Sequence, residues 1–160
     1  MKEITVAIMM GSKSDAPIME EAAKVLQDFG VSCEMRVLSA HRTPKETVEY
    51  VEKFASQGTK IAICGAGGSA ALAGVVAAHT TCPVIGVPLD SMGLDGIDSL
   101  LSTMQMPPGV PVGTVAIGKP GAKNAAFLAL RILALSDKGI EKKLEQYRDQ
   151  ERKKILETQL

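Results

Sequence analysis

Apolar segments of strand length alternate with other segments along most of the chain. The strand-like segments read ITVAIMM, CEMRVL, KIAICG, PVIGVPL and GTVAIG. The intervening segments are residues 18–29 with helical spacing, a helical stretch after Pro44, a small-residue segment up to Thr80, the segment around LDGIDSLLSTMQ, and the helical NAAFLALRILALS. Strands that are apolar on both faces and separated by helices predict a parallel sheet covered on both sides.

The order of these elements predicts an α/β fold of the flavodoxin-like type, a three-layer α/β/α sandwich. Right-handed crossovers between parallel strands favour this doubly wound topology. We expect one domain over residues 1–160, with its core at about residues 3–136. In such sheets, ligands bind where the carboxyl ends of the strands meet the switch in strand order.

The tail, at about residues 138–160, has a different pattern. It is highly charged and has only a sparse apolar stripe of Ile140, Leu144 and Tyr147. This pattern predicts a solvated helix that lies over the domain or over a neighbour.

The stretch SAHRTP, residues 39–44, follows the second predicted strand. Thr43 as a hydroxyl cap, Pro44 at the first helical position and Glu46 three residues after the cap predict the start of a helix. The apolar face of this helix is expected to contain Val48, Val51, Phe54 and Ala55. Capping does not explain the four residues before Thr43, which occupy the turn at the carboxyl end of a strand.

The loop GSKSD, residues 11–15, follows the first strand and precedes a helix. A glycine turn with Ser12 and Ser14 at a helix N-terminus presents amides and hydroxyls to one point, which suits a phosphate. A carboxylate beside it, Asp15, can accept hydrogen bonds from sugar hydroxyls, so a phosphoribosyl ligand would use both features. The alternative is that Ser14 or Asp15 only caps the helix.

The second predicted strand is followed by a loop at the same edge of the sheet as GSKSD. This loop contains Ser39, Ala40, His41 and Arg42. His41 suits proton transfer near neutral pH, because an unperturbed histidine has a pKa of about 6.5. Arg42 suits the phosphate. A lone histidine is more often structural, but the convergence of three loops favours a catalytic role. His79 lacks such neighbours and is interpreted as a structural residue at a helix end.

The third strand runs into GAGGSAALAG, residues 65–74. Glycine and alanine allow the backbone to approach a ligand closely, although close packing of helix on strand explains them about as well. The segment lacks the spacing of a dinucleotide fingerprint, and the chain has no P-loop motif. Neither a nicotinamide cofactor nor ATP hydrolysis is therefore predicted.

Composition narrows the classes of partner. Lysine plus arginine and aspartate plus glutamate number 18 each, and aromatic residues make up 3%. This balance predicts no binding to nucleic acid or to acidic membranes. Cys33, Cys64 and Cys82 are widely spaced and predict buried thiols rather than a disulfide framework or a zinc site. Two distant histidines predict no metal centre, and a reduced cytoplasmic setting is expected.

Six segments, taken in order, resemble the N5-carboxyaminoimidazole ribonucleotide mutase family of purine biosynthesis. They are GSKSD, SAHRTP, GAGG, PVIGVP, DSLLSTMQMPPGVPVGTVAIG and NAAFLALRIL, and the similarity runs from about Val6 to Leu135. The resemblance implies a flavodoxin-like fold and a homo-octamer in which neighbouring subunits complete each site. It also implies that no metal or organic cofactor is used.

By this resemblance, Ser12, Asp15 and Arg42 would bind the ribose phosphate, and His41 would transfer protons while a carboxyl group moves from N5 to ring carbon C4. The other residues that would line the substrate site are Ser14, Ser39, Ala40, Gly67, Gly68, Ser69, Ala70 and Leu72. The glycine and alanine loop would hold carbon dioxide beside the ring in a small, dry pocket.

The third loop departs from the family pattern. Bacterial mutases of the family usually read AAHLPG where this chain reads SAALAG, so Ala71 replaces a histidine and Ala73 a proline. Related aminoimidazole ribonucleotide carboxylases, which take carbon dioxide directly, have a loop more like SNALSG. The mutase is favoured because Arg42 with Pro44 and the GAGG run match its pattern. The alternatives are the carboxylase and a non-catalytic module that binds a nucleotide phosphate.

Overall fold

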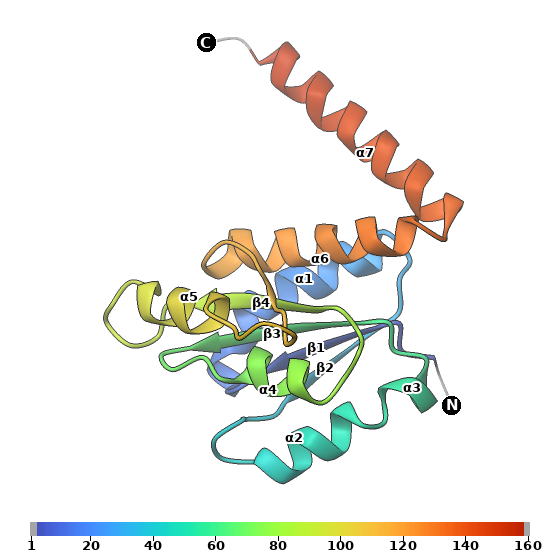
Figure 1. Cartoon of the computed structure of the whole chain (residues 1–160). Coiled ribbons are helices and arrows are strands. Elements are labelled where there is room, and N and C mark those ends of the chain that lie inside the picture. Colours follow the sequence, from blue (N-terminus) through green and yellow to red (C-terminus); the bar gives the residue numbers. More distant parts are fainter. Residues whose placement is uncertain (1–2, 159–160) are drawn as a thin grey trace.

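The computed structural model describes residues 3–158, which fold into a parallel sheet with helices on both faces (Figure 1). The five strands of this part of the chain are β1 (Val6–Met10), β2 (Cys33–Val37), β3 (Ile61–Gly67), β4 (Val84–Leu89) and β5 (Gly113–Thr114). Their order in the sheet is β2-β1-β3-β4-β5, and every neighbouring pair is parallel. This order is the flavodoxin-like one, so the predicted fold class is confirmed.

The helices divide between the two faces of the sheet (Figure 1). They are η1 (Lys13–Asp15, a short 3-10 helix), α1 (Ala16–Asp28), α2 (Pro44–Val51), α3 (Phe54–Gln57), α4 (Leu72–Ala78), α5 (Ile97–Met104), α6 (Gly118–Ala134) and α7 (Lys138–Glu157). The helices α1 and α6 cover one face, and α2, α3 and α4 cover the other. The sheet is therefore buried between two helical layers.

Side chains that alternate along each strand contribute to two hydrophobic cores, one on each face of the sheet. In β1, Val6 and Ile8 pack into the core beneath α1 and α6, whereas Ala7 and Met9 pack into the core beneath α2 to α4. Successive strand side chains point to opposite faces. Because both faces are covered, all five residues of β1 are buried, which explains the uninterrupted apolar runs in the sequence.

The helix after Pro44 is shorter than its periodicity predicts. α2 ends at Val51, and α3 starts at Phe54 after a break in the helix. The break changes the helical register, so the expectation that Ala55 lies on the apolar face is wrong: Ala55 is exposed. Tyr50 is buried instead, and its ring packs edge-on against Phe54 with a centroid distance of 5.6 Å.

The last predicted strand and helix also have different bounds. GTVAIG predicts a strand, but β5 contains only Gly113–Thr114, and α6 begins at Gly118, ahead of the predicted NAAFLALRILALS. Gly118 and Pro120 suggest that the helix starts only after them, yet Pro120 lies in the first turn of α6, where proline is tolerated. Gly121 lies so close to the Ala116 carbonyl that a side chain there would overlap it.

The tail forms α7, as predicted, and its far half projects away from the sheet (Figure 1). Ile140, Leu144 and Tyr147 are half-buried and pack against the core formed with α1 and α6. The Tyr147 ring lies 4.8 Å from that of Phe127 and 6.1 Å from that of Phe29, measured between centroids. The sparse stripe therefore attaches one end of the helix to the domain.

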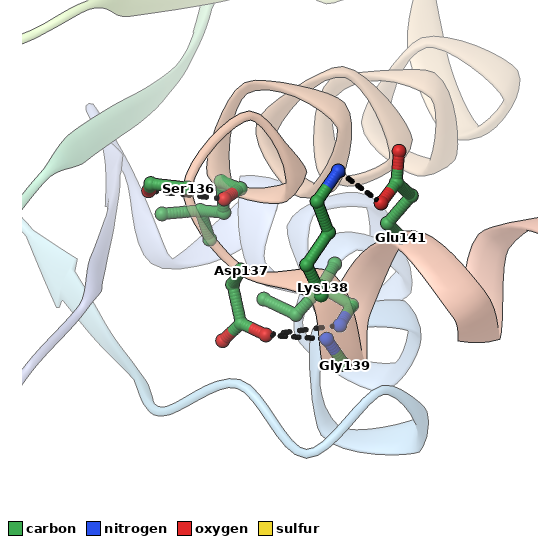
Figure 2. Close-up of polar contacts among 7 residues, drawn as sticks. Ser136, Asp137, Lys138, Gly139 and Glu141 are labelled. Carbon is green, nitrogen blue, oxygen red and sulfur yellow. Dashed lines mark hydrogen bonds and ion pairs between the residues drawn. The ribbon is translucent and has the colours of Figure 1, made fainter.

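Polar contacts fix the start of α7 (Figure 2). One carboxylate oxygen of Asp137 accepts hydrogen bonds from the amides of Gly139 and Ile140, at 2.8 and 3.1 Å. This N-cap satisfies two amides that have no partner within the helix. Further along, the Lys143 ammonium donates a 2.7 Å hydrogen bond to the Phe29 carbonyl at the end of α1.

The three cysteines differ in burial, so the prediction that all are buried is wrong. Cys64 in the central strand β3 is buried, whereas Cys33 and Cys82 are only half-buried. Cys33 lies on the edge strand β2, and Cys82 lies in the loop before β4, where one side is open. No disulfide occurs within residues 3–158.

No helix between residues 3 and 158 has both the length and the apolar character needed to cross a bilayer. His79 is exposed and lies at the C-terminal end of α4, as predicted for a residue at a helix end.

Candidate active site

A cavity of about 450 Å³ opens at the carboxyl ends of β1 to β4. It lies at the point where the strand order reverses: β1 has β2 as its neighbour on one side and β3 on the other, so the chain turns in opposite directions after β1 and after β2. The cavity is lined by Gly11, Ser12, Ser14, Asp15, Ser39, Ala40, His41, Arg42, Ala66, Gly67, Ala70, Ala71, Leu72, Ser91 and Met92. Four loops that are far apart in the sequence therefore contribute to one pocket.

The loop after β1 is held by a reciprocal capping box. The Ser12 hydroxyl accepts a 3.3 Å hydrogen bond from the Ser14 amide, and the Ser12 amide donates to the Asp15 carboxylate at 3.0 Å. The Ser14 hydroxyl also donates to the Ser12 hydroxyl at 2.8 Å. Ser12 is thus the capping residue, and Asp15, which precedes α1, makes no side-chain cap on that helix. Neither Ser14 nor Asp15 caps α1 through its side chain; instead, Ser12 and Asp15 together cap the 3-10 helix η1 that leads directly into α1.

Asp15 has opposing influences on its ionisation. Burial raises the pKa of its carboxyl above the ordinary value, and this effect is the largest. Hydrogen bonds from the Ser12 amide and the Ser14 hydroxyl, with the positive charge of Arg42, lower the pKa and oppose the shift. The carboxylate is therefore held in place by donors at some electrostatic cost.

Ser39 is the centre of the loop after β2. The Thr43 hydroxyl accepts a 2.9 Å hydrogen bond from the Ser39 amide and donates a 3.1 Å bond to the Ser39 carbonyl. These bonds occupy the Thr43 hydroxyl, so the prediction that it caps α2 is wrong. Pro44 does begin α2, as predicted. Thr43 closes the loop that presents His41.

Arg42 connects this loop to the first one. Its Nη2 donates a 2.7 Å hydrogen bond to the Gly11 carbonyl, and its Nε lies 3.5 Å from the Ser39 hydroxyl. A guanidinium carries five donor hydrogens in a planar fork. Arg42 is exposed and lines the cavity, and these two contacts leave several of its donor hydrogens without a partner in the described part of the chain.

His41 lies on the same wall and is exposed. Its imidazole makes no hydrogen bond to any residue in the described range 3–158. Both ring nitrogens are therefore available to a bound ligand, which is what a group that accepts and returns a proton requires.

The loop after β3 supplies a wall of small residues. Three of the five residues predicted to bind substrate in this loop line the cavity: Gly67, Ala70 and Leu72. Ala66 lines it too, as does Ala71, the residue at which the loop departs from the family pattern. Gly68 and Ser69, which the sequence also predicts as site residues, are not among the residues that line it. Gly68 has a φ of +59° and lies against the Met92 side chain. Ser69 is exposed, and its carbonyl accepts a hydrogen bond from the Ser102 hydroxyl.

Sequence reasoning missed the contribution of β4. Ser91 and Met92, directly after this strand, complete the cavity. No motif marks them, because they stand in an unremarkable loop, LDSMGLDG. The strand order itself was the available signal: β4 pairs with β3, so its carboxyl end reaches the same edge of the sheet.

Comparison with known proteins assigns a family. A sequence profile described as AIR carboxylase matches residues 5–154. A Pyrococcus abyssi relative is 57% identical over 144 residues, which is 90% of this chain and 82% of that protein. A Saccharolobus solfataricus relative is 50% identical over 155 residues, covering 97% of both chains. A Bacillus subtilis relative is 49% identical over 153 residues, covering 96% and 94%. Each of the three is named N5-carboxyaminoimidazole ribonucleotide mutase.

Solved structures agree with this assignment. The crystal structure of a single-residue variant of Treponema denticola PurE2 superposes with a TM-score of 0.88 and 34% sequence identity, covering 98% of this chain and 96% of that one. Treponema denticola PurE gives a TM-score of 0.87 at 33% identity, covering 97% and 96%. The family profile, the relatives and the shared architecture agree over nearly the whole length, and the chain belongs to the AIR carboxylase family.

Proposed function

We propose that the protein is an N5-carboxyaminoimidazole ribonucleotide mutase that converts its substrate to 4-carboxyaminoimidazole ribonucleotide in purine biosynthesis. The names of relatives that are about half identical over most of the chain support this activity. The observation that carries the proposal is one cavity in which an unengaged imidazole, His41, lies beside a cradle of hydroxyls and a guanidinium.

The ribose phosphate binds at the loops after β1 and β2. Ser12 and Ser14 supply hydroxyls, and Arg42 supplies donors and a positive charge, which together suit a phosphate. The Asp15 carboxylate accepts hydrogen bonds from ribose hydroxyls. Ser39 and Ala40 line the pocket beside His41, with their loop closed by Thr43. This arrangement directs the aminoimidazole toward the wall of small residues after β3.

His41 transfers the protons of the reaction. When the carbamate bond between N5 and the carboxyl carbon breaks, carbon dioxide is released, and N5 takes a proton from the protonated imidazole. Ring carbon C4 then bonds to the carbon dioxide, and the proton on C4 passes to the imidazole. One histidine therefore ends the cycle in the state in which it began. Gly67, Ala70 and Ala71 leave room for carbon dioxide next to the ring and keep it near C4.

The working form is a homo-octamer in the cytoplasm, and the reaction uses no metal or organic cofactor. These parts of the proposal are supported by the resemblance of the six sequence segments to the mutase family. Sedimentation of the purified protein tests the assembly, and an octamer sediments with eight times the mass of the 16.9 kDa chain.

The activity is tested by following formation of 4-carboxyaminoimidazole ribonucleotide in ATP-free buffer that contains a metal chelator. One reaction starts from the N5-carboxy compound at low bicarbonate, and the other starts from aminoimidazole ribonucleotide with added carbon dioxide. A protein-free reaction corrects for spontaneous loss of the carboxyl group. We expect efficient conversion of the N5-carboxy compound.

Two other outcomes would overturn the mutase proposal. Product from aminoimidazole ribonucleotide alone would identify a carboxylase, in which Ala71 accompanies a change of reaction. No product from either compound, with phosphoribosyl ligands still raising the melting temperature, would identify a non-catalytic binding module.

A further inference from the structure

We propose that Ser91 binds the migrating carboxyl group of the substrate through its hydroxyl. This inference rests on the proposed function and adds a contact from the fourth strand end to it. The predicted ligands of the phosphate and ribose, and the proton-transfer group His41, all come from the first two loops. Ser91 would hold the opposite end of the ligand.

The sheet places Ser91 at the cavity. Gly67 at the end of β3 is in register with Leu89 at the end of β4, and Ser91 follows Leu89 by two positions. Both Gly67 and Ser91 line the cavity. The serine therefore lies two positions beyond the residue that pairs with Gly67, at the same edge of the sheet.

Gly67 and Ser91 fit together closely. A Cβ atom at position 67 would overlap the Ser91 hydroxyl, and it would lie 2.8 Å from the Ser91 Cβ and 3.0 Å from the Leu89 carbonyl oxygen. Real Cβ atoms do not approach other atoms so closely, so only glycine at position 67 leaves space for this serine. Because Gly67 has no side chain, the Ser91 hydroxyl lies against the backbone of β3 at the edge of the pocket.

The Ser91 hydroxyl is also available to a ligand. It makes no hydrogen bond to another residue in the part of the chain that the structure describes. Among the cavity-lining residues that come from β3, β4 and their loops, Ser91 alone has a hydroxyl or a charged group. The other members of this wall are Ala66, Gly67, Ala70, Ala71, Leu72 and Met92.

The chemistry of the substrate then favours its carboxyl group as the partner. With the phosphate bound by Ser12, Ser14 and Arg42, the aminoimidazole reaches the small-residue wall. The group on that side that accepts hydrogen bonds most strongly is the carboxylate, on N5 before the reaction and on C4 after it. A hydroxyl donating to a carboxylate makes a short, charge-assisted hydrogen bond. Ser91 would orient this group, while His41 moves the protons.

Binding of two ligands to the Ser91→Ala variant tests the inference. 4-Carboxyaminoimidazole ribonucleotide has the carboxylate, and aminoimidazole ribonucleotide lacks only that group. We expect the variant to bind the first compound about tenfold or more weakly than the wild type, and the second with an unchanged dissociation constant. The control is Ser56→Ala on α3, where the hydroxyl bonds only to the Lys53 carbonyl, and we expect it to bind both compounds like the wild type.

The outcomes separate this inference from the proposed function. Equal weakening of both ligands in Ser91→Ala would indicate a disturbed loop and overturn the carboxylate contact. Unchanged binding of both ligands would overturn it too, with the mutase activity unaffected. If the wild type bound neither nucleotide, the proposed function would fail first and this inference with it.

Discussion

The guanidinium of Arg42 donates a 2.7 Å hydrogen bond to the carbonyl of Gly11, which lies 31 positions earlier in the chain. This bond joins the loop after β1 to the loop after β2. The first loop holds the serine cradle, and the second presents His41. Arg42 thereby fixes the spacing between the proposed phosphate site and the proposed proton-transfer group.

The Arg42→Lys variant tests this link. Lysine keeps the charge but cannot reproduce the planar fork that reaches the Gly11 carbonyl and a phosphate together. We expect KM to rise by about tenfold or more, since hydrogen bonds to charged groups are worth roughly 1.5–3 kcal/mol. The melting temperature should stay nearly constant because Arg42 is exposed. Arg131→Lys on the exposed surface of α6 is the control, and steady-state kinetics with an unchanged KM for Arg42→Lys would contradict the role.

The raised pKa of Asp15 predicts that the stability of the protein depends on pH. Burial raises the pKa of its carboxyl in the folded state above 3.8. A carboxyl whose pKa is higher in the folded state favours folding at pH values below its unfolded-state pKa. This contribution is lost as the pH rises through its folded-state pKa. At neutral pH the ionised carboxylate therefore costs stability, which Asp15→Asn should recover while its amide oxygen still accepts from the Ser12 amide.

Urea unfolding over a pH series measures this effect. We expect Asp15→Asn to be more stable than the wild type at neutral pH, and the two proteins to converge as the pH falls below 3.8. The variant should also have a higher KM, because it loses the charged acceptor for ribose. A variant that is less stable than the wild type at neutral pH would show that the capping-box hydrogen bonds outweigh the cost of burial.

Most of the fold could be predicted from the sequence because its three central strands, β1, β3 and β4, are buried on both faces. The apolar runs around Val6–Met10 and Val84–Leu89 have the length and composition of central parallel strands, and both are. The bounds after Gly113 could not be predicted, because Gly118 and Pro120 read as a breaker but lie in the first turn of α6. Local residue preferences do not reveal that the chain folds back on itself there.

The site was predictable where its residues lie in compact motifs. Ser12, Asp15, His41 and Arg42 lie within two short loops whose chemistry is visible in the sequence, and all four line the cavity. Ser91 belongs to no motif, and only the pairing of β3 with β4 brings it to the pocket. The sequence pattern also could not show that the Thr43 hydroxyl bonds to Ser39 rather than to the first turn of the helix, because both partners lie within four positions of Thr43.

Burial should make Cys64 inert. Desolvation raises the pKa of its thiol to about 12, so almost no thiolate exists at mildly alkaline pH. We expect Cys64 to stay unmodified by iodoacetamide in the native protein, while the half-buried Cys82 is alkylated first. Peptide mass spectrometry distinguishes the two sites, and a urea-unfolded sample shows that both can react. Rapid native labelling of Cys64 would contradict the packing of β3.

The N-cap of α7 makes a separate prediction for stability. Asp137→Ala leaves the amides of Gly139 and Ile140 without their shared acceptor and should lower the free energy of unfolding by about 1 kcal/mol (Figure 2). The neighbouring Ser136→Ala is the control, since that hydroxyl bonds only to the Leu133 carbonyl at 3.3 Å. Urea titration followed by circular dichroism compares them, and equal losses would argue against the cap.

The rate at which His41→Asn forms 4-carboxyaminoimidazole ribonucleotide from the N5-carboxy compound tests the central claim most directly. Asparagine keeps a polar side chain of similar reach but cannot accept and return a proton. The account predicts that turnover falls by at least about a hundredfold, while the product nucleotide still binds with a dissociation constant close to that of the wild type. A variant that retains a near-normal rate would contradict the assignment of His41 as the proton-transfer group.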